Sequence, residues 1–141
     1  MKFNRVWVFD LDNTLHNASP HIFPHINSAM TAYLQKHLGR DETAAGELRR
    51  RYWLRYGATL IGLMRNHATD PQHFLRATHD FPDLAAKIVA EPGLRATLRR
   101  LPGRKLVLST PPPHYAAEGV TDLGSAELFA DVFEIEAPGS R

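Results

Sequence analysis

The chain has 141 residues, of which 43% are hydrophobic and 23% charged, which suits one compact globular unit or a small core with an inserted subdomain. Its formal net charge of +2 is too small to indicate a nucleic-acid-binding protein, and the absence of cysteine excludes disulfides and thiolate metal sites. The sequence shows no signal peptide and no run near the roughly 18 apolar residues of a membrane span, so it predicts a soluble cytoplasmic protein without a membrane partner.

The first predicted element is a short strand at residues 6–9, where "VWVF" consists only of β-branched and aromatic residues. This pattern is typical of a strand that is buried on both faces of a parallel sheet. A helix is expected next, with Ser19 as its N-cap, Pro20 in its first position and Gly39 at its end.

Further helices complete an insert between the first and second strands. One should begin at about Asp41 and be interrupted near Gly57, and another should begin after Asp70, an N-cap with Pro71 behind it. Helical spacing of apolar residues dominates these stretches, so the sequence predicts an all-helical insert.

Beyond Pro92 the pattern alternates between helix and strand. A short helix at residues 93–101 leads through the turn "PGR" into a buried strand, "KLVLS", and further helical residues precede a third strand, "DVFEIE". This alternation predicts an α/β fold with a parallel, Rossmann-like sheet. We expect an α/β core of residues 1–16 and 93–141, and a helical cap of residues 17–92.

Two carboxylates follow the first strand. In open α/β sheets, ligands bind beyond the carboxyl ends of the strands, so Asp10 and Asp12 lie where chemistry is expected. Two acids this close repel each other unless a cation lies between them. A magnesium ion with a phosphate ester would supply that charge, and one carboxylate could then attack phosphorus while the other handles protons. The alternative is that both aspartates only end the strand and form a turn.

The string "VWVFDLDNTL" resembles the signature of the haloacid dehalogenase superfamily of phosphatases, in which four apolar residues precede Asp-x-Asp-x-Thr. The resemblance implies Asp10 as the nucleophile that forms an aspartyl-phosphate, Asp12 as the general acid and base, and Asp10 with the backbone carbonyl of Asp12 as ligands of Mg²⁺. It also implies that Thr14 braces the site by hydrogen bonding and contributes to phosphate binding. Ser109, followed by Thr110, is expected to hold the phosphate at the end of the second strand.

The insert resembles the cap of the pyrimidine 5′-nucleotidase branch of that superfamily, in the stretches "RRRYWLRYGATLIGL" and "DPQHFLRATHDF", followed by "LPGRKLVLST". This resemblance implies a magnesium-dependent phosphatase that hydrolyses a pyrimidine nucleotide or another small phosphorylated metabolite. We expect Arg51, Tyr52, Tyr56 and Thr59 on the substrate-facing side, although aromatic residues at such positions more often form the core of a cap.

The chain departs from the family pattern after the third strand. The family has a later Lys or Arg that neutralises the phosphate and a later acidic pair that completes the magnesium site, and the sequence is expected to be truncated before both. Lys105 lies four residues before Ser109, at the opposite end of its strand, and Arg141 is the last residue. Without the strand that pairs with it in the family, the first strand would form an apolar sheet edge, so self-association or instability is expected.

Two other functions stay open. The chain could be a non-catalytic remnant of such a phosphatase that binds magnesium or phosphate weakly. It could also bind RNA through the arginine-rich stretch "RRRYWLR", although a solvated helix face explains this stretch more simply and nucleic acid is not the expected partner. His21 and His25 are four residues apart, but no third zinc ligand accompanies them.

Overall fold

The computed structural model describes residues 4–134, and the chain divides into two compact units. One unit, here called the α/β unit, combines the residues up to Phe23 with those from Phe81 onward. The other, the helical unit, consists of residues 24–80. The sequence placed these boundaries after residues 16 and 92, whereas the structure groups residues 17–23 and 81–92 with the α/β unit.

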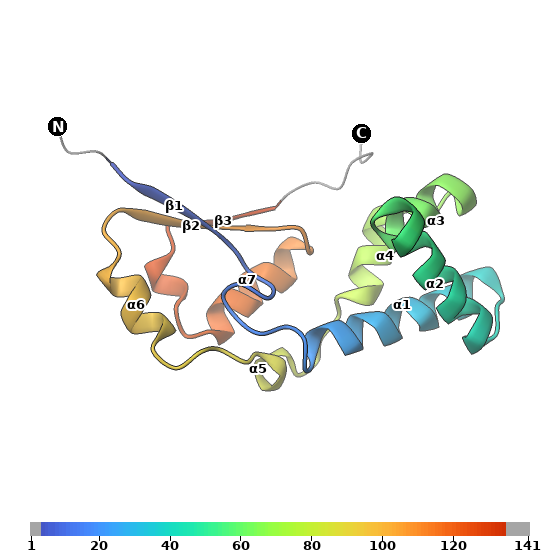
Figure 1. Ribbon diagram of the computed structural model, residues 1–141, viewed down its shortest axis with the longest axis horizontal. Helices are drawn as coiled ribbons and strands as arrows, with labels where there is room; N and C mark the ends of the chain where they lie inside the picture. The colour runs from blue at the N-terminus through green and yellow to red at the C-terminus, as the bar shows by residue number, and fades with distance from the viewer. Residues whose placement is uncertain (1–3, 135–141) are drawn as a thin grey trace. The chain divides into compact units, whose positions relative to one another are not determined.

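Three parallel strands form the sheet of the α/β unit, which confirms the predicted fold class (Figure 1). Strand β1 (Val6–Asp10) pairs with β2 (Arg104–Ser109), and β2 pairs with β3 (Asp131–Glu134), in the order β1-β2-β3. The register places Asp10 opposite Leu108. The predicted continuation of the third strand, residues 135–136, lies outside the described residues.

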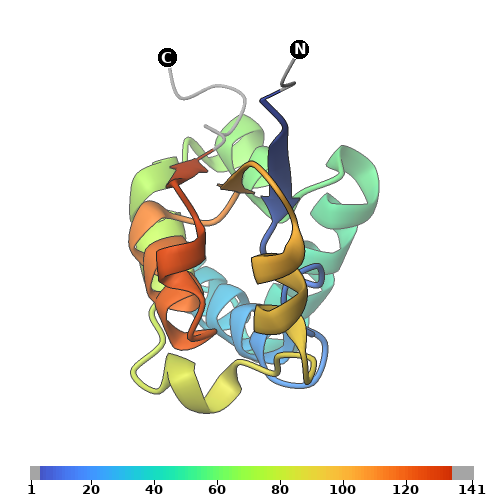
Figure 2. The same ribbon diagram turned by 90° about the vertical axis from the view of Figure 1, so that its left-hand side faces the viewer.

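Helices cover one side of this sheet. The longest are α6 (Leu94–Arg100) and α7 (Pro113–Asp122), which lie on the same side of the strands in both views (Figures 1 and 2). A short helix, α5 (Leu84–Lys87), and a 3₁₀ turn, η1 (Ala126–Leu128), complete the described helices of the unit.

The first strand is not buried on both faces, so that prediction was wrong for the described residues. Val6 is 52% and Val8 58% exposed, whereas Trp7 and Phe9 are half-buried. Side chains alternate along a strand, and helices cover only the side that Trp7 and Phe9 face. Among residues 4–134 β1 pairs only with β2, so self-association through this edge stays a prediction, to be checked by sedimentation velocity.

Four helices make up most of the helical unit, and their ends follow the predicted capping residues. Helix α1 (Ile22–Leu38) ends at Gly39, and α2 (Glu42–Tyr56) ends at Gly57, both in the left-handed conformation. Helices α3 (Thr59–His67) and α4 (Pro71–Thr78) follow. Asp41 and Asp70 act as N-caps, because their carboxylates accept hydrogen bonds from backbone N–H groups in the first turns of α2 and α4.

Helix α1 begins two residues later than predicted. The backbone N–H groups of Ile22 and Phe23 both donate to the carbonyl of Ala18, so the residues between Ala18 and Ile22 form a turn and Ser19 does not cap the helix. None of the helices in the described part of the chain is long and apolar enough to span a membrane.

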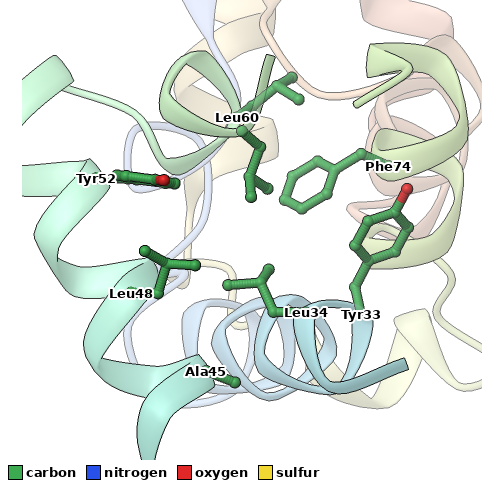
Figure 3. Close-up of a cluster of buried hydrophobic side chains, with 8 residues drawn as sticks. Tyr33, Leu34, Ala45, Leu48, Tyr52, Leu60 and Phe74 are labelled. Carbon is green, nitrogen blue, oxygen red and sulfur yellow. The ribbon is translucent and has the colours of Figure 1, made fainter. Parts of the chain in front are cut away.

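The helical unit has a hydrophobic core of its own, to which all four helices contribute (Figure 3). In the figure, leucine side chains lie between Tyr52 on one side and the rings of Phe74 and Tyr33 on the other. The buried members are Tyr33, Leu34, Ala45, Leu48, Tyr52, Leu60, Leu63 and Phe74. Burial of these side chains stabilises the unit. A large apolar side chain contributes about 1.5–3 kcal/mol to the free energy of unfolding when it is fully buried.

Two helical glycines of this unit give a matched test of the packing. A Cβ added at Gly62 would overlap the side chain of Tyr52, whereas one added at Gly46 would meet no atom within 4 Å. We expect Gly62→Ala to lower the free energy of unfolding by about 1–3 kcal/mol through overpacking, and Gly46→Ala to raise it by about 0.5–1 kcal/mol. Urea denaturation checks both variants, and equal effects would contradict the close approach of α2 and α3.

Candidate active site

The loop that follows β1 is a tight turn held by buried leucines and backbone hydrogen bonds. Leu11 and Leu15 are buried, and the backbone N–H of Leu15 donates to the carbonyl of Leu11 at 2.9 Å. Asn13 has a φ of 62°, a left-handed conformation that asparagine tolerates better than most residues. The backbone N–H of Ala18 donates to Asn13 Oδ1 at 3.3 Å. The turn thus fixes the backbone that carries both aspartates.

Asp10 is the last residue of β1, and its side chain is exposed. The hydroxyl of Thr14 donates a hydrogen bond of 3.3 Å to Asp10 Oδ2. Thr14 therefore contacts Asp10, and its role in a phosphate site stays a prediction. Neither Asp10 nor Asp12 forms an ion pair with a lysine or arginine among residues 4–134.

The side chain of Asp12 is held by two residues that the sequence did not predict. Tyr115, from α7, donates its hydroxyl to Asp12 Oδ1 at 2.6 Å, and His16 Nε2 lies 2.8 Å from the same oxygen. Burial and then the nearby Asp12 carboxylate raise the pKa of Tyr115 above its usual value, so the phenol stays protonated and donates. Only the spacing of four residues between Asp12 and His16 hinted at this contact in the sequence.

Besides Thr14, the two other predicted phosphate-binding hydroxyls, those of Ser109 and Thr110, differ in their surroundings. Ser109 ends β2 and is only 1% exposed, and its Oγ has no hydrogen-bond partner in the described structure. Thr110 is exposed. A buried hydroxyl without a partner costs free energy, so Ser109 Oγ is a candidate for a hydrogen bond that the described residues do not supply. Asp10 and Ser109 lie at the same edge of the sheet, because β1 and β2 are parallel and in register there.

The basic residues that were considered for the phosphate site do not reach it in the described structure. Lys105 is buried at the start of β2, and its Nζ donates to the backbone carbonyls of Leu101 at 2.7 Å and Gly103 at 3.4 Å. This ammonium group therefore belongs to the end of the sheet opposite Ser109. Arg141 lies outside the described residues.

The four predicted substrate residues all belong to the helical unit. Tyr52 and Thr59 are buried there, where the Tyr52 hydroxyl is 2.8 Å from His67 Nε2 and the Thr59 hydroxyl donates to a backbone carbonyl of α2. Tyr56 is half-buried with two guanidinium groups over its ring, and Arg51 is exposed. The hydroxyls of Tyr52 and Thr59 are thus already used inside the unit, and a substrate role for all four residues stays a prediction.

The oxygen atoms of the loop are of the chemical type that magnesium binds. Within residues 4–134 there is no group of three or more histidine, aspartate or glutamate side chains that could hold a metal ion. Magnesium does not need such a group, since it often takes one or two protein oxygens and completes its shell with water and substrate phosphate. The exposed Asp10 carboxylate and the backbone carbonyl of Asp12 are hard oxygen donors of this kind.

No family model and no curated protein matches the chain. Among solved structures it is similar to L-2-haloacid dehalogenase from Xanthobacter autotrophicus, with 21% identity and a TM-score of 0.49 over 94% of this chain and 57% of that one. The same enzyme with chloropropionic acid covalently bound matches with 18% identity and a TM-score of 0.46, over the same shares of the two chains. A candidate phosphatase from Clostridium difficile matches with 14% identity and a TM-score of 0.48, over 100% of this chain and 65% of that one. The chain thus spans less than two thirds of each of these proteins.

Replacing Ser109 tests whether its hydroxyl serves folding or a ligand. Because Oγ is buried without a partner, we expect Ser109→Ala to keep or raise the free energy of unfolding, by up to about 1 kcal/mol. Thermal and urea denaturation measure this, with Ser125→Ala as the control, since the buried Ser125 hydroxyl does donate to a backbone carbonyl. A loss of stability in Ser109→Ala as large as that in Ser125→Ala would show that the Ser109 hydroxyl has a structural partner.

Proposed function

We propose that the chain carries the nucleophilic site of a magnesium-dependent phosphatase that hydrolyses small phosphate monoesters. The observation that carries the proposal is that three groups end or follow two neighbouring parallel strands, at the carboxyl end of the sheet. These are the exposed Asp10 carboxylate, the Asp12 carboxylate held by two hydrogen bonds, and the unpartnered hydroxyl of Ser109. The match of "VWVFDLDNTL" to the haloacid dehalogenase signature supports the same assignment.

In the proposed reaction, a carboxylate oxygen of Asp10 attacks phosphorus, and the bond between phosphorus and the leaving oxygen breaks. Asp12 donates a proton to the leaving oxygen and then removes one from a water molecule, which attacks the aspartyl-phosphate and regenerates Asp10. Thr14 orients Asp10, while Ser109 and Thr110 offer hydroxyls to the phosphate oxygens. Bound Mg²⁺ supplies the positive charge that offsets the phosphate and the carboxylates.

We propose pyrimidine nucleoside monophosphates as the substrate class, on the resemblance of the helical insert to the nucleotidase cap. Arg51 is the predicted substrate residue whose side chain is exposed, with no ion pair among the described residues. Its guanidinium group could bind a phosphate or a carbonyl oxygen of a base. A small metabolite, rather than nucleic acid, is the expected partner.

A specific observation favours one alternative, a non-catalytic remnant of such a phosphatase. The described residues provide no lysine or arginine partner for Asp10 or Asp12 and no third acidic ligand near them. Loss of one charge-stabilising group typically lowers the rate by about 10²–10³-fold. The chain would then be a non-catalytic remnant that binds magnesium or phosphate weakly.

Phosphate release with and without Asp10 tests the proposal. The substrates are uridine and cytidine monophosphates and 4-nitrophenyl phosphate, each with Mg²⁺ and with excess chelator. We expect release that requires Mg²⁺ and that falls by about three orders of magnitude or more in Asp10→Asn, because the amide cannot attack phosphorus. Asp70→Asn is the matched control, since asparagine caps a helix as well as aspartate.

The outcomes separate the two functions. Equal release by the chain and Asp10→Asn would overturn the proposed role of Asp10. If both the chain and Asp10→Asn are folded and neither releases phosphate, the non-catalytic remnant is the correct function.

A further inference from the structure

One oxygen of the Asp12 carboxylate accepts both of its hydrogen bonds. Tyr115 Oη is 2.6 Å and His16 Nε2 is 2.8 Å from Asp12 Oδ1, and no residue in the described ranges bonds to Oδ2. The two donors come from different parts of the chain, since His16 lies in the loop after β1 and Tyr115 lies in α7 after β2. Two separate segments therefore hold Asp12 through hydrogen bonds to the same oxygen, Oδ1.

The direction of these hydrogen bonds follows from the chemistry of the groups. An ionised carboxylate only accepts, so the phenol of Tyr115 and the Nε2–H of His16 must both donate. Both donors are rigidly placed: Tyr115 is 1% and His16 3% exposed, and the Tyr115 ring packs against the buried Phe81 with 5.2 Å between ring centroids. The position of Oδ1 is thus fixed by buried groups.

We propose that Tyr115 and His16 are positioning residues for the proton-transfer step, and that Asp12 Oδ2 is the oxygen that gives and takes the proton. This inference rests on the proposed function. The two donors occupy both lone pairs of Oδ1, so a proton carried by the carboxyl group resides on Oδ2. In the reaction Oδ2–H donates to the leaving oxygen as the phosphorus–oxygen bond breaks, and Oδ2 then accepts a proton from the attacking water.

The kinetic test compares esters that differ in their need for a proton. The variants are Tyr115→Phe, His16→Met, which lacks a donor, and His16→Gln, whose amide N–H can replace Nε2–H. Because kcat/KM reports the attack of Asp10, the loss should be about 10- to 100-fold for uridine monophosphate, whose alkoxide leaving group needs a proton. It should be severalfold at most for 4-nitrophenyl phosphate, which leaves without one. His16→Gln should recover most of the loss seen in His16→Met.

Tyr33→Phe is the matched control, because its hydroxyl also bonds to a histidine, His73 at 2.8 Å, but within the helical unit. It should leave both rates unchanged. Equal losses for the two esters in Tyr115→Phe, or no recovery in His16→Gln, would overturn the positioning role.

A second measurement does not need activity. The effect of Tyr115→Phe on the urea midpoint is compared in the native chain and in an Asp12→Ala background. A hydrogen bond between the two side chains predicts a clear drop in the native chain and little change once Asp12 is absent. If the chain releases no phosphate, the proposed function fails and this comparison alone decides. A drop in the urea midpoint that requires Asp12 supports the hydrogen bond of Tyr115 to Oδ1. Equal drops in the native chain and in the Asp12→Ala background overturn it.

Discussion

The parallel pairing of β1 with β2 is the constraint on which the rest of the candidate site depends. Parallel strands bring their carboxyl ends to one edge, and the register that sets Asp10 opposite Leu108 places Ser109 one residue beyond that pair. Because side chains alternate along a strand, a shift of one residue would reverse which residues of the shifted strand face the helices. The backbone pairing thus sets where the candidate residues lie along the two strands.

Much of this arrangement could be predicted from local sequence signals. Asp41, Gly57 and Asp70 mark helix ends through their own backbone and side-chain chemistry, which needs no distant partner. The hold of Tyr115 on Asp12 could not be predicted, because it joins residues 103 positions apart and no periodic pattern encodes such a contact. The exposure of Val8 was mispredicted for a related reason, since an apolar strand does not reveal whether a second layer covers it.

In the helical unit, aromatic residues that could stack on a nucleotide base are used for packing instead. Tyr52 is an aromatic residue of the kind that could stack on a base, yet its ring closes a core and its hydroxyl bonds to His67. Gly62 lies so close to that ring that no larger residue fits without a shift. Exposed side chains such as Arg51 are less constrained by the core, so they can vary without loss of the fold.

Lys105 directs its charge away from the site, and this has a thermodynamic consequence. Its ammonium group satisfies the carbonyls of Leu101 and Gly103, while the carboxylates of Asp10 and Asp12 have no lysine or arginine partner in the described chain. An anionic ester that approaches this edge alone meets like charge. Under the proposed function its affinity would be linked to that of the cation, so that each raises the apparent affinity of the other by the same factor.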